Sequence, residues 1–130
     1  MRVLADTNLF IKFCRQLPLP AAVEKSLADE KNERCLASIS VIELFRLWQS
    51  GRVPETPDSW LDAALTSWTV IPLTVPIARQ SVLWPWPHKD PADRIIAATA
   101  HLEKIELWHT DTLLKKLPGF PQRYFPNVPA

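Results

Sequence analysis

Short apolar runs alternate with amphipathic stretches along the whole chain. The apolar runs, which are typical of buried strands, lie at residues 2–5, 35–39, 69–73 and 106–110. Apolar positions at helical spacing between them predict helices at residues 9–13, 21–32, 40–50, 57–65, 74–83, 91–105 and 111–117. The proline-rich end is compatible with a last edge strand at residues 122–125 or with an irregular course. Strands that alternate with helices predict an α/β fold with a mainly parallel sheet.

Three short runs carry explicit signals for helix starts and breaks. The run from Ser40 to Glu43 has the S-x-x-E pattern, which predicts a capping box at the start of a helix. The run from Asp90 to Asp93 supplies an acid at the N-cap, then a proline, then a second acid in the first turn. The run from Trp84 to His88 must be a loop, because its two prolines lack donors and restrict their neighbours.

The composition narrows the class of protein. With 47% hydrophobic content, residues 1–130 are expected to form one domain with its own core. The formal net charge of +1 names no partner, and two glycines are too few for the glycine-rich loops that bind nucleotide phosphates. Cys14 and Cys35 stand apart in apolar contexts, so core positions and a reducing cytoplasm are expected. No apolar stretch has the length of a signal peptide or a membrane helix, so no membrane contact is expected.

Four acidic residues fall beside the expected carboxyl ends of strands. Asp6 follows the first strand, Asp111 follows the fourth, and Asp93 opens the helix after the proline loop. Glu43 lies among apolar residues after the second strand, where an unpaired carboxylate would be costly. Ligands of parallel sheets bind beyond the carboxyl ends of the strands, so we expect the four acids to converge. Each acid taken alone also fits helix capping, and we assign that structural role to Asp90.

Converging carboxylates repel one another unless a cation neutralises them. Carboxylate and water oxygens suit Mg²⁺ or Mn²⁺, whereas zinc normally requires histidine or cysteine as well. His88, His101 and His109 lack the spacing of a ligand set, so structural roles are expected for them. A metal held by carboxylates supports the hydrolysis of phosphodiester bonds.

The same residues, in the same order, resemble PIN-domain ribonucleases, and closely the VapC-like toxins of type II toxin-antitoxin pairs. The resemblance covers nearly the whole chain and rests on Asp6-Thr7-Asn8, Ser40-x-x-Glu43-Leu44, the run from His88 to Ala100, and Thr110-Asp111. It implies a three-layer α/β/α PIN-like fold with a strand order of 3-2-1-4-5.

The resemblance also implies roles for the acids and partners for the protein. Asp6 and Asp93 match the principal metal-binding acids, Glu43 and Asp111 assist directly or through water, and the Thr110 hydroxyl often assists as well. The implied activity is that of a Mg²⁺- or Mn²⁺-dependent endoribonuclease. The implied partners are RNA, a second copy of the chain in a homodimer, and a cognate antitoxin whose tail enters the acidic cleft.

Further residues near the expected site remain open to more than one interpretation. Arg94 is expected either to orient phosphate or to pair with a carboxylate, and we favour the ion pair. Trp84 and Trp86 are compatible with stacking on bases, covering a dimer interface, or simple packing. Seven basic residues flank the expected cleft, and some are expected to follow an RNA backbone: Lys12, Arg15, Arg46, Arg52, Lys115, Lys116 and Arg123.

Three alternatives compete with a toxin nuclease. A receiver-type signalling domain also gathers acids at strand ends, but the third expected strand ends without an acid and Asp6 stands alone. A non-catalytic PIN-like binding module would be expected to lack one or more of the four acids, all of which are present. A housekeeping nuclease that processes RNA would share the same chemistry, and the sequence does not separate it from a toxin.

Overall fold

The computed structural model describes residues 1–129, so Ala130, the last residue of the expected domain, lies outside the described residues. Five strands form one sheet: β1 (Arg2–Ala5), β2 (Glu33–Ala37), β3 (Thr69–Ile71), β4 (Glu106–His109) and β5 (Gln122–Tyr124). Their order is β3-β2-β1-β4-β5 and every neighbouring pair is parallel, which confirms the expected fold class and strand order. Receiver domains have the order 2-1-3-4-5, so this topology excludes that alternative.

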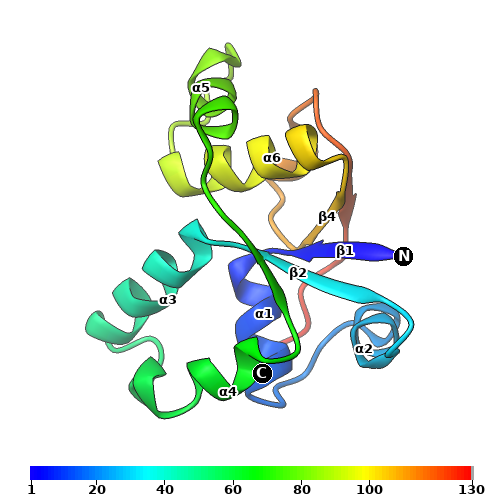
Figure 1. Ribbon diagram of the computed structural model, residues 1–130, viewed down its shortest axis with the longest axis vertical. Helices are drawn as coiled ribbons and strands as arrows, with labels where there is room; N and C mark the ends of the chain where they lie inside the picture. The colour runs from blue at the N-terminus through cyan, green and yellow to red at the C-terminus, as the bar shows by residue number, and fades with distance from the viewer. Residues whose placement is uncertain (130) are drawn as a thin grey trace.

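Helices cover both faces of the sheet (Figure 1). On one face lie α5 (Val75–Leu83) and α6 (Pro91–Glu103), and on the other lie α1 (Thr7–Cys14), α2 (Ala21–Ala28), α3 (Ile39–Gln49) and α4 (Leu61–Leu65). Two single turns of 3-10 helix complete the chain, η1 (Pro57–Ser59) and η2 (Leu114–Lys116). The expected three-layer arrangement is therefore present.

The two cores follow from the alternation of side chains along the strands. Val3 and Ala5 of β1 pack in the core beneath α1, whereas Leu4 between them packs in the core beneath α6. The same division separates Leu36 from Cys35 and Ala37 in β2. Successive residues of a strand point to opposite faces, so a sheet that is covered on both faces needs apolar runs without polar interruptions.

The expected helix 21–32 extends too far, because α2 ends at Ala28. The next residues form a side-chain-stabilised turn in which the Asn32 amide donates to Ser26 O at 2.9 Å and Lys31 N donates to Asp29 Oδ1 at 2.9 Å. Such local bonds offer the backbone an alternative to the helix. The strand after the turn consequently begins and ends two residues earlier than expected, at Glu33–Ala37.

The expected capping box at Ser40 and Glu43 is wrong. The N-cap of α3 is Ser38, and its hydroxyl accepts a hydrogen bond from Leu73 N at 3.1 Å instead of capping the helix. Ser40 lies buried inside α3, and the Glu43 carboxylate accepts from the Thr7 hydroxyl of α1. Hydrogen bonds to other segments of the chain have thus taken the place of the expected capping bonds within the helix.

Three further helices differ from expectation. Residues 57–65 form η1 and α4 rather than one helix, and residues 111–117 form only the turn η2, after Asp111 Oδ1 accepts from Leu113 N at 2.8 Å. In α6 the expected inward residue Leu102 is 39% exposed, while Ala97, Ala98 and Ala100 are buried. Five consecutive residues of α6, from Ile96 to Ala100, are buried, so the middle of this helix is covered on several sides.

The last strand is held by a buried histidine. His109 Nδ1 accepts from Asp111 N at 3.1 Å, so Nε2 carries the proton and donates to Gln122 Oε1 at 2.7 Å. Gln122 in turn donates to Leu117 O at 2.7 Å. Burial lowers the pKa of His109, which keeps the ring neutral and confirms its structural role. This network orders β5 where the proline-rich sequence left the course of the chain open.

Within residues 1–129, no helix combines the length and the apolar character that crossing a membrane requires.

Candidate metal centre

A cavity of about 920 Å³ opens beyond the carboxyl end of β1, between the start of α1, the length of α3 and the first turns of α6. Four acids line it: Asp6, Glu43, Asp90 and Asp93. They come from three segments that are far apart in the sequence, and the parallel sheet brings these segments together. Ile39, Ile42 and Ile95 give the same cavity an apolar wall.

Asp6 lies at the base of this cavity and is only 9% exposed. It is the N-cap of α1, and its Oδ1 accepts from Leu9 N at 2.7 Å. Burial raises the pKa of Asp6 to about 7; backbone hydrogen bonds from Leu9 and Thr110 oppose the rise, and the charges of Asp93 and Glu43 add to it. Asp6 therefore both caps α1 and belongs to the group of acids that lines the cavity.

Glu43 lines the cavity from α3, and the Thr7 hydroxyl holds its carboxylate. The Thr7 hydroxyl donates to Glu43 Oε1, and Thr7 Oγ1 also lies 2.8 Å from Ser40 Oγ in a hydrogen bond. Burial raises the pKa of Glu43, the Thr7 bond opposes this, and the charges of Asp93 and Asp90 add to it. The sequence pattern missed the role of Thr7, although its place directly after Asp6 was a usable signal.

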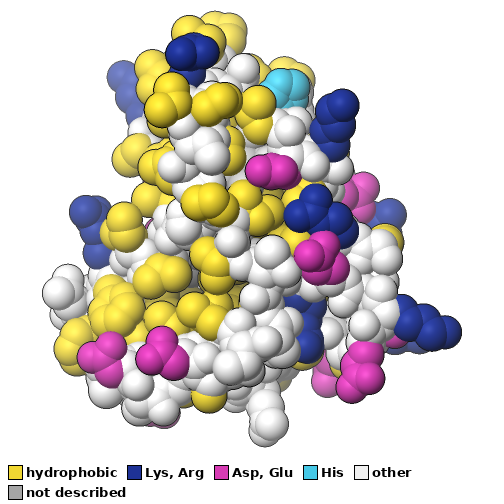
Figure 2. Space-filling model, in the orientation of Figure 1, with side chains coloured by type: hydrophobic (Ala, Val, Ile, Leu, Met, Phe, Trp, Pro, Cys, Tyr) yellow, Lys and Arg dark blue, Asp and Glu magenta, His cyan; other side chains and the backbone are white. Residues whose placement is uncertain are grey.

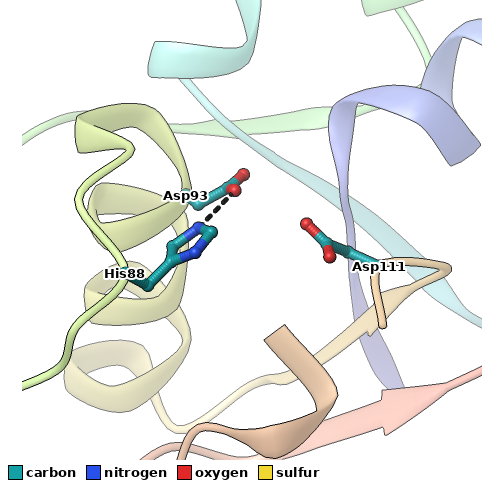
Figure 3. A group of neighbouring side chains, drawn as sticks. All are labelled: His88, Asp93 and Asp111. Carbon is teal, nitrogen blue, oxygen red and sulfur yellow. Dashed lines mark hydrogen bonds and ion pairs between the residues drawn. The ribbon is translucent and has the colours of Figure 1, made fainter. Parts of the chain in front are cut away.

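Asp93 opens α6 on the opposite side of the cavity, and His88 holds its carboxylate (Figure 3). His88 Nε2 lies 2.8 Å from Asp93 Oδ2. Burial raises the pKa of Asp93, the hydrogen bond from His88 opposes this, and the charges of Asp90 and Asp111 add to it. Asp90 itself accepts from Ala92 N at 3.0 Å and from Asp93 N at 3.4 Å, which confirms its assignment as the N-cap.

Asp111 reaches toward Asp93 from the segment after β4 (Figure 3). One ligand atom each from His88, Asp93 and Asp111 lie within 4.8 Å of one another. Asp111 does not line the large cavity, and Asp6 and Glu43, which do line it, are not part of this group of three. The neighbouring Thr110 hydroxyl accepts from the Asn8 amide at 3.2 Å, which ties the end of β4 to the start of α1.

The model of the PIN domain family, described as "PIN domain", matches residues 3–119 of the chain. This match spans every acid of the candidate site. The chain belongs to the PIN-domain family. The resemblance inferred from the sequence is thereby confirmed at the level of the family. No curated protein matches this PIN domain in sequence.

Solved structures of other proteins share the fold of this PIN domain, including chains from Rickettsia felis, Salmonella typhimurium and Klebsiella pneumoniae. A chain of VapBC2 from Rickettsia felis, bound to a DNA fragment from its promoter, matches with a TM-score of 0.73 and 19% identity over 96% of this chain and 99% of that one. DNA-bound VapBC from Salmonella typhimurium matches with a TM-score of 0.69 and 15% identity over 95% and 98%. A toxin-antitoxin complex from Klebsiella pneumoniae matches with a TM-score of 0.65 and 23% identity over 90% and 93%. Identities this low show a shared fold.

The donor set of this PIN domain fits a hard divalent cation. Burial raises the pKa values of Asp6, Glu43 and Asp93, so their ionised forms are costly when no counter-charge is present. No ion pair with lysine or arginine neutralises any of the three within residues 1–129. Carboxylate oxygens are the ligands that Mg²⁺ and Mn²⁺ prefer, and such a cation supplies the missing positive charge.

Arg94, beside Asp93, does not make the ion pair that we favoured, and it does not face the cavity. Its guanidinium donates to backbone carbonyls, including those of Ser81 at 2.6 Å and His88 at 2.7 Å. Trp84 and Trp86 stack on each other with centroids 4.1 Å apart and planes 9° apart, and both lie against Phe120. Their packing role is therefore established, and their rings are occupied by neighbours.

The seven basic residues expected near the cleft occupy different environments. Arg46 alone among them lines the cavity formed by the described residues. Arg15 pairs with Glu55 at 2.8 Å and Arg123 pairs with Glu106 at 3.2 Å. Lys12 donates to Val128 O at 2.8 Å and thereby ties the segment after β5 to α1. Arg46 is thus the residue of the seven that can contact a ligand in the cavity.

Proposed function

We propose that this PIN domain is a Mg²⁺- or Mn²⁺-dependent endoribonuclease that hydrolyses RNA phosphodiester bonds, with residues 1–130 as a single domain. One observation carries the proposal: Asp6, Glu43 and Asp93 line one cavity, and burial raises the pKa of each. Perturbed acids that meet in a cleft are typical of functional sites. Their placement in a PIN fold supports nuclease chemistry.

In this proposal Asp6 and Asp93 are the principal metal ligands, and Glu43 and Asp111 bind the ion directly or through water. The ion that these residues would hold would polarise the phosphate and would lower the pKa of a water molecule. Thr7 fixes the orientation of Glu43, and Asn8 fixes the Thr110 hydroxyl next to Asp111. These bonds order the ligands before the substrate arrives, which reduces the reorganisation that the reaction needs.

Arg46 supports a nucleic acid as the substrate. It lies one turn after Glu43 on α3, lines the acidic cavity and is exposed. A guanidinium at this point can bind a phosphate of the RNA backbone beside the metal. Ile39 and Ile42 line the cavity on the same helix and offer an apolar surface for a sugar or base.

The Arg46→Gln variant is expected to raise the KM for RNA about tenfold, because one charge-assisted hydrogen bond is worth roughly 1.5 kcal/mol. Its binding should also depend less on salt, with the slope against the logarithm of salt concentration reduced by about 0.7 for one lost phosphate contact. Arg79→Gln on α5 is the matched control, since Arg79 is exposed but does not line the cavity. Equal effects of the two substitutions would contradict the role given to Arg46.

The proposed activity is tested by incubating the purified protein with total cellular RNA. Cleavage is expected in Mg²⁺ or Mn²⁺ and is expected to stop in EDTA. An otherwise folded protein that leaves RNA intact with every divalent ion would contradict the nuclease and favour the non-catalytic binding module.

We further propose that the protein is the toxin of a toxin-antitoxin pair, acts in the cytoplasm as a homodimer, and is inhibited by a cognate antitoxin. The similar VapBC and toxin-antitoxin structures support this proposal. Exposed hydrophobic side chains gather over α5 and along α3 (Figure 2), including Val75, Val82, Leu83 and Ile42. Exposed apolar groups of this kind suit contacts with other proteins.

Induced expression separates a toxin from a housekeeping nuclease. A toxin is expected to arrest growth, and co-expression of the small protein encoded next to it is expected to restore growth. Unimpaired growth with active nuclease present would favour the housekeeping role.

A further inference from the structure

The side chain of Arg94 donates its hydrogen bonds to backbone carbonyl oxygens. Within residues 1–129 its guanidinium donates to five carbonyls, those of Ser81, Val82, Trp84, Trp86 and His88, and to no carboxylate. These carbonyls belong to the end of α5 and to the loop that leads into α6. One side chain therefore ties together three consecutive parts of the chain.

The loop needs such a partner because of its composition. Carbonyls at the end of a helix lack internal donors, and Pro85 and Pro87 contribute no N–H groups to replace them. Arg94 supplies the donors, and its guanidinium also lies against the face of Trp86, 5.3 Å from the ring centroid. A lysine at this position would retain the charge but would lose the planar fork that reaches several carbonyls.

The loop ends at the residue that touches the metal centre. Arg94 Nη1 donates to His88 O at 2.7 Å, and the ring of His88 places Nε2 2.8 Å from Asp93 Oδ2 (Figure 3). Oδ1 of Asp93 has no hydrogen-bond partner within residues 1–129. Because Nε2 is engaged by a carboxylate oxygen, its proton lies on the line between the two residues and the ring is directed at Asp93.

We propose that His88 and Arg94 are positioning residues for the metal ligand Asp93. His88 fixes the orientation of the Asp93 carboxylate and leaves one oxygen free for the cation, and Arg94 fixes the backbone from which His88 extends. The inference rests on the proposed function, because it assigns Asp93 to the metal. It gives Arg94, the residue that follows Asp93 in the chain, a positioning task outside the cavity.

The test measures dissociation constants for Mg²⁺ and Co²⁺ by calorimetry, without RNA. His88→Ala and Arg94→Lys are each expected to weaken both ions about 10- to 100-fold, which is the usual effect of removing a partner that orients a ligand. His88→Gln is expected to recover most of the loss, because its amide nitrogen can donate to Asp93 from the position of Nε2. Arg79→Lys is the matched control and should leave both constants unchanged.

If His88→Ala weakens the binding of Mg²⁺ and of Co²⁺ by the same factor, the result supports His88 as a positioning residue for Asp93. A much larger loss for Co²⁺ than for Mg²⁺ in His88→Ala would make the imidazole a direct ligand and overturn the proposal, since imidazole favours Co²⁺. Unchanged constants in His88→Ala would also overturn it.

A double variant distinguishes a shared pathway from general damage to the fold. If Arg94 acts through His88, the variant with both Arg94→Lys and His88→Ala should bind metal about as weakly as His88→Ala alone. If the double variant loses metal affinity by the product of the two single factors, Arg94 does not act through His88 and this part of the proposal is overturned. Since no RNA is present, a protein that binds metal in this way but cleaves nothing would contradict only the proposed nuclease.

Discussion

Replacing Asp93 with asparagine is expected to reduce RNA cleavage at least about a hundredfold, because even partners that only orient a metal ligand are commonly worth 10- to 100-fold. The amide has nearly the same shape but carries no charge, so the ion loses a principal ligand. Folding should be preserved, since the substitution removes a charge that is unfavourable in its place: burial raises the pKa of Asp93, and the charges of Asp90 and Asp111 add to the rise. Cleavage rates at saturating Mn²⁺ measure the effect.

The matched control is Asp90→Asn. Asp90 lines the same cavity and lies three residues before Asp93, but its oxygen caps α6. Asparagine caps helices as well as aspartate does, so activity within a few-fold of the original is expected. Similar losses in both variants would mean that the total negative charge of the cavity matters and that Asp93 has no special place in it.

The second large effect concerns the stability of the metal-free protein. The folded pKa of Asp6 is about 7, compared with 3.8 for an ordinary aspartate, so the folded state binds more protons than the unfolded state between these values. Stability contributed by this group is therefore lost as the pH rises through that window. Between pH 5 and pH 7 the loss is on the order of 2 to 3 kcal/mol at about 1.4 kcal/mol for each pH unit.

Comparison with Asp6→Asn isolates this contribution. Asparagine retains the N-cap but cannot ionise, and His109, whose lowered pKa acts in the opposite direction, is present in both proteins. In EDTA the melting temperature of the original protein should fall relative to the variant by roughly 8 °C from pH 5 to pH 7. Adding Mg²⁺ or Mn²⁺ at pH 7 should reverse the difference, because the ion binds the ionised folded state.

Parallel melting curves with no pH-dependent gap between the two proteins would contradict the raised pKa of Asp6. A gap that metal does not close would contradict Asp6 as a ligand while leaving its burial intact.

Much of the fold was readable from the chain because its signals are local. Uninterrupted apolar runs such as 2–5 mark strands that are buried on both faces, and the acid-proline-acid start of α6 is complete within four residues. The convergence of Asp6, Glu43 and Asp93 followed from their places after strands or at helix starts, since the carboxyl ends of parallel strands lie at the same edge of a sheet. These features depend on backbone periodicity and topology.

The errors have a common cause. Ser40 and Glu43 have the sequence of a capping box, but Thr7 from another segment binds both side chains, and so the local pattern was outcompeted. Arg94 had the charge for an ion pair, but its N–H groups donate to carbonyls at the end of α5 and in the 84–88 loop. A side chain bonds to whatever the folded chain brings near it, and sequence distance does not reveal that partner.

The sequence by itself thus indicated the family, implied the order of the strands through that resemblance, and predicted that Asp6, Glu43 and Asp93 lie at one cavity. Only the tertiary structure decided that His88 holds Asp93, that His109 and Gln122 order β5, and that Arg46 is the basic residue that reaches the cavity. The physical reason is that apolar periodicity acts over a few residues, whereas hydrogen bonds act over about 3 Å between groups whose separation is set by the packing of the whole chain.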